Sequence, residues 1–297
     1  MHDSASEKVY CAMQYLEHID TTHPAFGDLY DELPLWSAPF GLLLLERVPM
    51  RPGLTVLDVG AGTGFLTVEL AQRCGPQARV IAVDPWAAGM QRLRRKLEYL
   101  GIENVRLIEQ DAADLDLPEA SIDVVVSNLG INNFANADAV LRTCLRVTKP
   151  GGRLLLTTNL VGHMQEFYDV YRATLLELEL ADRLATLDAH INHRATPASV
   201  TAQLIRAGFA LLTVATDACR MRFADGSSFL RHAFVRLAFL PAWTPVVPPD
   251  AVERTFTMLE RKLNVVAAER GELALTIPMA CVEAYKPGAT EALAQGG

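Results

Sequence analysis

Between residues 55 and 158, the chain alternates short apolar runs with longer amphipathic segments. The apolar runs predict strands, and they fall at residues 55–59, 79–83, 105–109, 122–127 and 153–158. The segments between them predict helices, at residues 65–74, 87–100 and 137–148. Strands that alternate with helices and are apolar on both faces form a parallel sheet with helices on each side. The sequence therefore predicts an α/β fold with a doubly wound, mostly parallel sheet.

Beyond residue 158, the pattern predicts further helices and two more strands. The helices fall at residues 163–187, 197–207 and 251–270, and the strands at residues 209–216 and 273–285. Pro278 interrupts the last run, which predicts an edge strand or a bulge there. About fifty residues separate these two strands, more than a hairpin needs, so we expect an insertion that builds a cap or a substrate wall.

The composition limits the partners of the chain. It has 297 residues, half of them hydrophobic, and a formal net charge of −8, which disfavours an extended nucleic-acid-binding surface. The one local basic run, at residues 92–96, is predicted to be a solvated helix face. The five cysteines lie far apart without a Cys-x-x-Cys pair, so neither a disulfide framework nor a zinc site is predicted.

The apolar segments and the N-terminus indicate the compartment. The N-terminus has an acidic residue and no apolar core, so no signal peptide is predicted, and no apolar run is long enough to cross a bilayer. Scattered cysteines are typical of a reducing compartment. We therefore expect a cytoplasmic protein without membrane insertion. The sequence leaves the oligomeric state open.

A glycine-rich loop follows the first predicted strand and opens the first predicted helix. Gly60, Gly62 and Gly64 let the backbone approach a ligand without side-chain clashes. A dinucleotide fingerprint needs its third glycine at the position that Phe65 occupies here. The loop therefore favours a nucleotide-derived cofactor other than a dinucleotide.

Polar side chains stand at the ends of the next three strands. Asp84 ends the second, Asp111 follows the third and Asn128 follows the fourth. Open α/β sheets hold their ligands at the carboxyl ends of the strands. A carboxylate at Asp84 can accept hydrogen bonds from both hydroxyls of a ribose, and Asp111 can meet an adenine amino group. These residues predict one cofactor crevice.

Three segments in this order resemble the class I S-adenosylmethionine-dependent methyltransferases. Residues 54–64 resemble the first motif of that family, residues 80–84 its second-strand motif, and residues 145–152 the motif that leads into the fifth strand. The resemblance covers about residues 50–160. It implies a Rossmann-like, seven-stranded sheet whose last strand is antiparallel, with residues 209–216 and 273–285 as the terminal pair.

The resemblance also implies which residues bind S-adenosylmethionine. The expected roles are contacts to the methionyl amino group, passage of the backbone beneath the ribose and methionine, a diol acceptor, and residues that flank the adenine. The cofactor-binding set is Asp58, Gly60, Ala61, Gly62, Gly64, Asp84, Pro85, Trp86, Asp111, Ala112 and Asn128. S-adenosylhomocysteine is the expected product.

The four parts of the chain take their expected roles from the same resemblance. Residues 1–50 are expected to form an N-terminal helical segment over the active site, and residues 51–218 the cofactor-binding core. Residues 219–272 are expected to form the substrate cap, and residues 273–297 the final core strand and a tail.

The acceptor end of the site offers fewer sequence signals. A weak acceptor needs a general base, and His163 and His190 are the candidates, with a structural role as the alternative. Tyr30, Trp36, His193 and Arg194 are candidate substrate contacts, with packing or surface roles as their alternatives. Arg222 and Arg231 are two further cations that could hold an acidic acceptor, and aromatic residues of the insertion could form a pocket wall or the core of the cap. His190 and His193 have no evident third partner, so no metal site is predicted.

The functional hypothesis is an S-adenosylmethionine-dependent methyltransferase that modifies a carbon or an oxygen of a small-molecule acceptor. The chain is similar to the group that includes the ubiquinone- and menaquinone-pathway C-methylating enzymes. One alternative is a nicotinamide-dependent oxidoreductase on a similar sheet, which the Phe65 position disfavours. Another is a non-catalytic cofactor-binding protein.

Overall fold

The computed structural model describes residues 14–17, 19–21, 23, 25–31, 33 and 35–288. Its contacts divide the chain into two units. The sheet unit comprises His23–Leu160, Ala195–Asp217 and Met279–Gly297, and the helical unit comprises Met1–Thr22, Val161–Arg194 and Ala218–Pro278. Two long strands, β6 (Ala210–Phe223) and β7 (Leu273–Tyr285), contribute residues to both.

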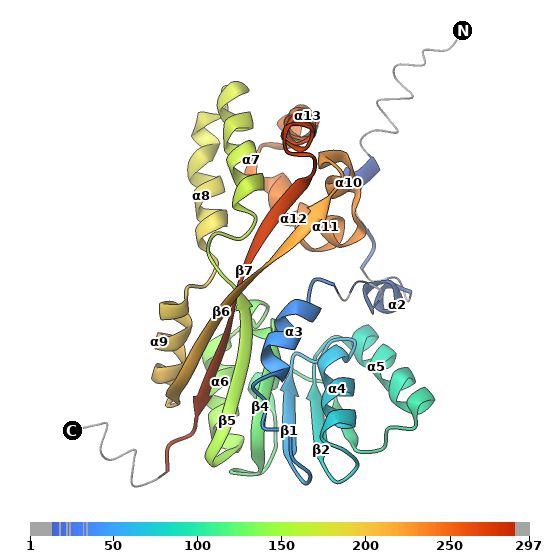
Figure 1. The fold of residues 1–297 in the computed structure, drawn as a ribbon, viewed down its shortest axis with the longest axis vertical. Coiled ribbons are helices and arrows are strands. Elements are labelled where there is room, and N and C mark those ends of the chain that lie inside the picture. Colours follow the sequence, from blue (N-terminus) through green and yellow to red (C-terminus); the bar gives the residue numbers. More distant parts are fainter. Residues whose placement is uncertain are drawn as a thin grey trace, which may run out of the picture. The chain divides into compact units, whose positions relative to one another are not determined.

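The sheet has seven strands in the order β3-β2-β1-β4-β5-β7-β6 (Figure 1). The first five are β1 (Thr55–Val59), β2 (Arg79–Val83), β3 (Val105–Ile108), β4 (Ile122–Asn128) and β5 (Thr148–Asn159). They pair in parallel, whereas β7 runs antiparallel to β5 from Arg153↔Tyr285 to Asn159↔Met279. The predicted mixed sheet is confirmed. The chain order reverses between β1 and β4, and open sheets of this kind bind ligands at such a switch point.

Helices cover both faces of this sheet because its strands are apolar on both sides. One face carries α3 (Ala38–Leu45), α4 (Phe65–Arg73) and α5 (Ala87–Leu100). The other carries α6 (Ala137–Val147) and α9 (Pro197–Ala207). The neighbours Val56 and Leu57 on β1 are both fully buried, one in the core on each face.

β6 runs to Phe223, seven residues past its predicted end, and two further strands differ from their predicted form. β5 begins at Thr148 rather than at residue 153, because Thr148 pairs with Ile122 before the register shifts. β7 lies between β5 and β6 and is therefore not the edge strand that Pro278 suggested. Pairing with β5 starts at Met279, so Pro278 precedes that ladder and its missing N–H is not needed there.

The helix predicted over residues 163–187 is divided in the structure. α7 (Gln165–Glu177) ends where Glu179 adopts a left-handed conformation with φ 58° and the N–H of Leu180 bonds back to the carbonyl of Leu175. A short helical turn (Ala181–Arg183) and α8 (Leu184–Asn192) follow. A left-handed residue ends a helix, and Glu179 does so without the glycine that usually signals such an end in a sequence.

An aromatic core holds the helical unit together. Its other helices are α10 (Gly226–Arg231), α11 (Ala233–Ala238), α12 (Leu240–Trp243) and α13 (Val252–Arg270). Trp243 and Phe229 are fully buried, and the ring of Phe167 on α7 stacks on Trp243 at 4.1 Å between centroids. Aromatic residues of the insertion therefore form part of the core of this unit.

Short elements complete the described chain: η1 (Gln14–Leu16), α2 (Phe26–Asp31), η2 (Ala112–Asp114), η3 (Gly130–Asn132), η4 (Ala181–Arg183), η5 (Thr244–Val246) and η6 (Pro249–Ala251). Among the helices of the described residues, none combines the length and the apolar character needed to cross a membrane.

Candidate functional site

The glycine loop of the sheet unit connects β1 to α4 with three glycines in left-handed conformations. The φ angles of Gly60, Gly62 and Gly64 are 78°, 54° and 88°, values that residues with a Cβ rarely adopt. The N–H groups of Gly60 and Ala61 donate to the carbonyl of Val83, at the end of β2. The loop is therefore anchored to the end of β2, the strand next to β1.

The second and third glycines of the loop face different surroundings. A Cβ added to Gly64 would lie 2.1 Å from a methyl carbon of Leu93, so Gly64 is required for the packing of the loop against α5. A Cβ added to Gly62 would meet nothing within 4 Å. Gly62 therefore keeps an open surface on the loop, whereas Gly64 serves the core.

Asp58 lies at the end of β1 and is 1% exposed. Its carboxyl accepts a hydrogen bond from the hydroxyl of Thr67 on α4, at 2.6 Å. Burial raises the pKa of Asp58 to about 7, against the effect of the Thr67 hydrogen bond, and the nearby charge of Asp84 raises it further. Asp58 ties the strand to the helix that the loop opens.

Asp84 directly follows β2, and one of its two carboxyl oxygens holds the glycine loop. One oxygen accepts from the N–H of Gly62 at 2.8 Å, and the other accepts from the N–H of Trp86 at 2.8 Å. Burial raises the pKa of Asp84, although both backbone hydrogen bonds act to lower it. A carboxylate has about four acceptor positions, so about one on each oxygen remains for a further donor.

Two aromatic residues of α2 pack on Trp86, which stands two residues after Asp84. The ring of Tyr30 meets Trp86 edge to face at 5.2 Å between centroids, and the ring of Phe26 lies 5.7 Å from Trp86. Burial raises the pKa of Tyr30, and the charge of Asp84 adds to that shift. The predicted cofactor residue Trp86 and the predicted substrate residue Tyr30 are thus brought together.

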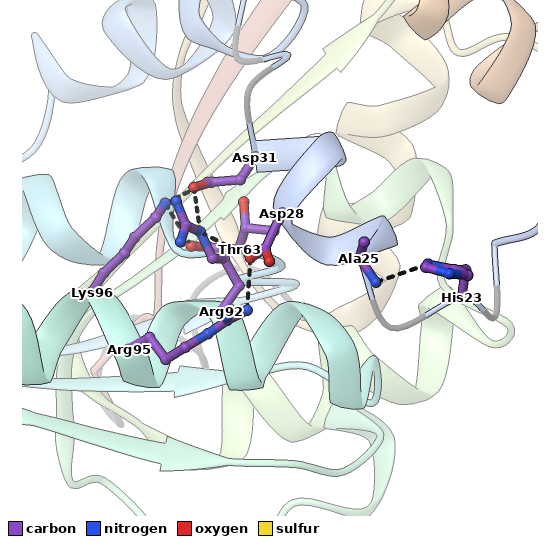
Figure 2. A network of polar contacts seen from close by, with 8 residues as sticks. All are labelled: His23, Ala25, Asp28, Asp31, Thr63, Arg92, Arg95 and Lys96. Atoms are coloured by element: carbon purple, nitrogen blue, oxygen red, sulfur yellow. Dashed lines mark hydrogen bonds and ion pairs between the residues drawn. The ribbon is translucent and has the colours of Figure 1, made fainter.

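A clasp of charged residues joins α2 to α5 and to the glycine loop, as Figure 2 shows. We define the clasp as Asp28 and Asp31 on α2 with Arg92, Arg95 and Lys96 on α5. Arg92 donates to Asp31 at 2.8 Å, and Arg95 donates to Asp28 at 2.6 Å. Lys96 bonds to Asp31 and also donates to the carbonyl oxygen of Thr63 in the loop, at 2.9 Å.

The clasp corrects the interpretation of the basic run as a solvated helix face. Arg92, Arg95 and Lys96 stand at i, i+3 and i+4 and so share one side of α5, where each forms an ion pair with Asp28 or Asp31. Burial would raise the pKa of Asp31, but hydrogen bonds from Lys96 and Arg92 hold it below its ordinary value. The matching i, i+3 spacing of the aspartates was the available sequence signal.

Replacing Lys96 by methionine is expected to loosen α2. The change removes a half-buried ion pair and a charged hydrogen bond to the loop, so the amide hydrogens of residues 26–31 should exchange with solvent about tenfold faster. Hydrogen-exchange mass spectrometry measures this. Arg73→Met is the control, because Arg73 pairs with Glu69 on its own helix. Equal exchange in the two variants would show that Lys96 does not hold α2.

The other cofactor candidates lie at the ends of β3 and β4. Asp111 caps the short turn that begins at Ala112 by accepting from the N–H of Ala113 at 2.8 Å. The amide of Asn128 donates to the carbonyl of Ser37 at 3.1 Å, and its oxygen accepts from the hydroxyl of Thr157 at 2.7 Å. Ala112 is buried, and Pro85 is exposed beside Asp84.

Trp36 lies just before α3 in the sheet unit, and its ring is 5.6 Å from that of Phe40. Phe40 is fully buried, so this pair anchors the start of α3. Because Asn128 bonds to Ser37, the residue next to Trp36, the segment before α3 is fixed to the end of β4. These contacts support a packing role for Trp36, the alternative to substrate contact.

The predicted acceptor-side residues gather in the helical unit. His163 is 1% exposed and its ring lies 5.4 Å from that of Phe239. His190 accepts or donates a hydrogen bond with the Tyr168 hydroxyl at 3.0 Å, and its ring lies 5.2 Å from that of His193. Burial lowers the pKa of His163, and the charge of Arg194 lowers it further. His163, His190, His193 and Arg194 are therefore one cluster.

The remaining candidate arginines are engaged elsewhere in this unit. Arg222 forms a two-pronged ion pair with Glu272, and Arg231 pairs with Glu260 while lying over the ring of Tyr15 at 4.9 Å. Within the described residues, no group of three or more His, Cys, Asp or Glu side chains has the arrangement to hold a metal ion.

Sequence reasoning missed the residues that support the site indirectly. Thr67 fixes Asp58, Lys96 connects α2 to the loop, and Tyr168 links His190 to the core of the helical unit. Thr67 lies in the first turn of α4 and Tyr168 lies in the amphipathic helix α7, and neither belongs to a recognisable motif. Only Lys96 stood in a segment that the sequence marked as unusual.

Comparison with known proteins adds relatives by sequence. The model of a methyltransferase domain family matches residues 50–198. The chain is 32% identical over 181 residues to the ubiquinone/menaquinone biosynthesis C-methyltransferase UbiE of Pseudomonas paraeruginosa, across 57% of this chain and 70% of that protein. It is 35% identical over 131 residues to the protein of that name from Idiomarina loihiensis, across 43% of this chain and 52% of that protein. The chain thus spans about half the length of the second relative.

Solved structures resemble the chain in fold. The YcgJ protein from Bacillus subtilis superposes with a TM-score of 0.58 at 16% identity, covering 85% of this chain and all (100%) of that one. A putative methyltransferase from Bacillus halodurans gives a TM-score of 0.55 at 19% identity, covering 84% and 99%. Phosphoethanolamine N-methyltransferase 2 of Haemonchus contortus, solved with S-adenosylhomocysteine, gives 0.54 at 16%, covering 93% and 59%.

Proposed function

The chain belongs to the methyltransferase domain family, and we propose that it uses S-adenosylmethionine to methylate a carbon or an oxygen of a small-molecule acceptor. The observation that carries this proposal is the left-handed loop from Gly60 to Gly64, in which the N–H of Gly62 donates to the carboxylate of Asp84. The names of the curated relatives, which describe C-methyltransferases of quinone biosynthesis, agree with it.

The residues at the loop fit S-adenosylmethionine. Gly62 leaves an open surface where a ligand can approach the backbone, and Asp84 retains acceptor capacity for the two hydroxyls of a ribose. Trp86 offers an aromatic ring beside that carboxylate. A dinucleotide is disfavoured, because Phe65 takes the place of the glycine that its pyrophosphate requires.

The chemistry asks mainly for orientation by the protein. When bound, S-adenosylmethionine supplies a methyl group on a positively charged sulfur, and transfer by in-line displacement is accelerated by proximity and alignment. In this proposal Gly60, Gly62 and Asp84 bind the cofactor, while the clasp holds α2 and its Tyr30 next to Trp86.

The base roles of His163 and His190 stay predictions, and the pKa values bear on them. Burial, with the charges of His193 and Arg194, lowers the pKa of His190 to about 4. The pKa of His163 is lowered by burial first and by Arg194 next. Both rings are therefore neutral near pH 7, and both are weaker bases than a free imidazole.

We also propose the class of partner and the compartment, from the net charge and the cysteine pattern. A net charge of −8 supports a small acceptor rather than nucleic acid. The cysteine pattern supports the cytoplasm as the compartment. Among the described residues, four cysteines form no disulfide, which agrees with a reducing compartment: Cys74, Cys144, Cys219 and Cys281.

Replacing Asp84 by alanine tests the cofactor assignment. The change removes charge-assisted hydrogen bonds to the ribose and frees the N–H of Gly62, so the affinity for S-adenosylhomocysteine should fall about tenfold to 100-fold. Titration calorimetry measures the affinity. Asp116→Ala, at an exposed aspartate, is the matched control and should bind as the unchanged chain does. An unaltered affinity in Asp84→Ala would refute the ribose role, and an unchanged chain that binds no S-adenosylhomocysteine would refute the proposed function.

A further inference from the structure

The cluster of His163, His190, His193 and Arg194 is carried by two segments of the helical unit. His163 precedes α7, while the other three stand at the carboxyl end of α8 and just beyond it. α7 and α8 lie side by side (Figure 1). Along the chain, His163 follows the last residue of β5 by four positions, and Arg194 directly precedes Ala195, which is bridged to Leu160.

Hydrogen-bond direction in the cluster can be deduced from the donors. The indole of Trp243 donates to the Tyr168 hydroxyl at 3.1 Å, and an indole is a donor only, so the Tyr168 oxygen accepts from it. We assign the proton of that hydroxyl to the hydrogen bond with Nε2 of His190, 3.0 Å away. Nε2 of His190 is then an acceptor, and the proton of the neutral ring is on Nδ1. The network therefore presents an N–H donor at His190.

Arg194 differs from the other arginines named for the acceptor. Arg222 and Arg231 each pair with a glutamate, whereas Arg194 forms no ion pair within the described part of the chain. Its Nε is buried and has no hydrogen-bond partner among the described residues. A half-buried cation without a counter-charge is disfavoured, and the carboxyl end of α8 compensates it only weakly.

No carboxylate is among the groups whose electrostatic effects lower the pKa values of His163 and His190. The groups whose charges act on His163 are Arg194, His190 and His193, and those acting on His190 are His193 and Arg194. The nearest acidic side chain on α8, Asp188, is already paired with Arg172. The cluster therefore combines one permanent positive charge with directed N–H donors and lacks an internal counter-charge among the described residues.

We propose that Arg194, His163 and His190 bind an anionic oxygen group, a carboxylate or a phosphate, on the methyl acceptor. This inference rests on the proposed function and names the chemical class of its substrate. An anion supplies the counter-charge that Arg194 lacks and the acceptor that its Nε–H and the His190 Nδ1–H require.

Exposure within the cluster agrees with a ligand that enters from solvent. His193 is exposed, His190 and Arg194 are half-buried, and His163 is buried. Tyr168, Phe239 and Trp243 lie beside the histidines and are themselves buried, so the cluster rests on the aromatic core of the helical unit. An anion would therefore approach the cluster from its exposed side, at His193.

Three probes with the same ring test the proposal: phenyl phosphate, benzoate and the neutral benzyl alcohol. We expect the two anions, or one of them, to bind at least about tenfold more tightly than benzyl alcohol, because charge-assisted hydrogen bonds form only with the anions. Which anion binds distinguishes a phosphate from a carboxylate site. Calorimetry near pH 6, in buffers of different ionisation enthalpy, should also show proton uptake, since an anion raises the pKa of neighbouring histidines.

Arg194→Gln is the decisive variant, with Arg222→Gln as its matched control. Anion affinity should fall about tenfold or more in Arg194→Gln and stay unchanged in Arg222→Gln, whose arginine is paired with Glu272. S-adenosylhomocysteine binding, measured on the same samples, reports whether each variant is folded. His193→Gln, at an exposed position, gives a second test that does not disturb the core, and a loss of about threefold is expected.

Two outcomes would overturn the inference and leave the proposed function standing. In one, the unchanged chain binds S-adenosylhomocysteine but binds neither anion more tightly than benzyl alcohol. In the other, Arg194→Gln and Arg222→Gln bind the anions equally well. Failure of the unchanged chain to bind S-adenosylhomocysteine, with anion binding intact, would instead overturn the proposed function.

Discussion

Replacing Gly64 by valine is expected to lower the free energy of unfolding by about 2–6 kcal/mol. At φ 88° a branched residue is strained by about 1–3 kcal/mol. Its Cβ would also lie 2.1 Å from a methyl carbon of Leu93, a side chain that is itself fully buried, and such overpacking costs about 1–3 kcal/mol. Urea-induced unfolding of the purified chain measures the change.

Gly53→Val separates the two contributions to this loss. Gly53 has a similar φ of 78°, but a Cβ there would meet nothing within 4 Å. Its valine variant should therefore lose only the strain, about 1–3 kcal/mol. If the two variants were equally destabilised, the contact between Gly64 and Leu93 would carry no weight, and the packing of the loop on α5 would need another explanation.

Gly62→Val is expected to abolish measurable binding of S-adenosylhomocysteine while the chain stays folded. Gly62 also has a positive φ, 54°, and open space where its Cβ would stand, so the cost to stability should match that of Gly53→Val. A branched side chain would fill the surface of the loop on which the ligand is proposed to lie, and the affinity should fall about 100-fold or more.

The comparison between Gly62 and Gly64 makes this prediction specific. A valine should remove cofactor binding at Gly62, which faces open space. The same change should reduce stability more strongly at Gly64, which faces α5. Binding is measured by calorimetry and folding by circular dichroism. A folded Gly62→Val variant with normal affinity would show that the ligand does not approach the loop at this position.

The strands and most helices could be predicted because their signals are local. The period of apolar residues marks β1 to β4, and helix ends are marked by residues with few alternatives, such as Gly101 and Gly208, which both adopt left-handed conformations. The division of the helix between α7 and α8 had no such mark, because Glu179 takes a left-handed conformation that its residue type disfavours.

The positions of the proposed cofactor residues at strand ends could be predicted for the same reason. Gly60, Gly62 and Asp84 stand at strand ends, and the topology of an open sheet brings successive strand ends to one edge. Sequence spacing could not separate the roles of the glycines, since only the position of Leu93 makes Gly64 a packing residue. Likewise, only the placement of α2 against α5 turns a basic helix face into a clasp.

The sequence by itself determined the class of fold and the loop that is proposed to bind the cofactor, because both depend on residues close together in the chain. Tertiary structure alone decided how distant charges pair. It set Arg222 against Glu272 and Arg231 against Glu260, and it left Arg194 half-buried without a carboxylate among the described residues. Ion pairing depends on distances between side chains that are far apart in sequence, and local patterns do not contain those distances.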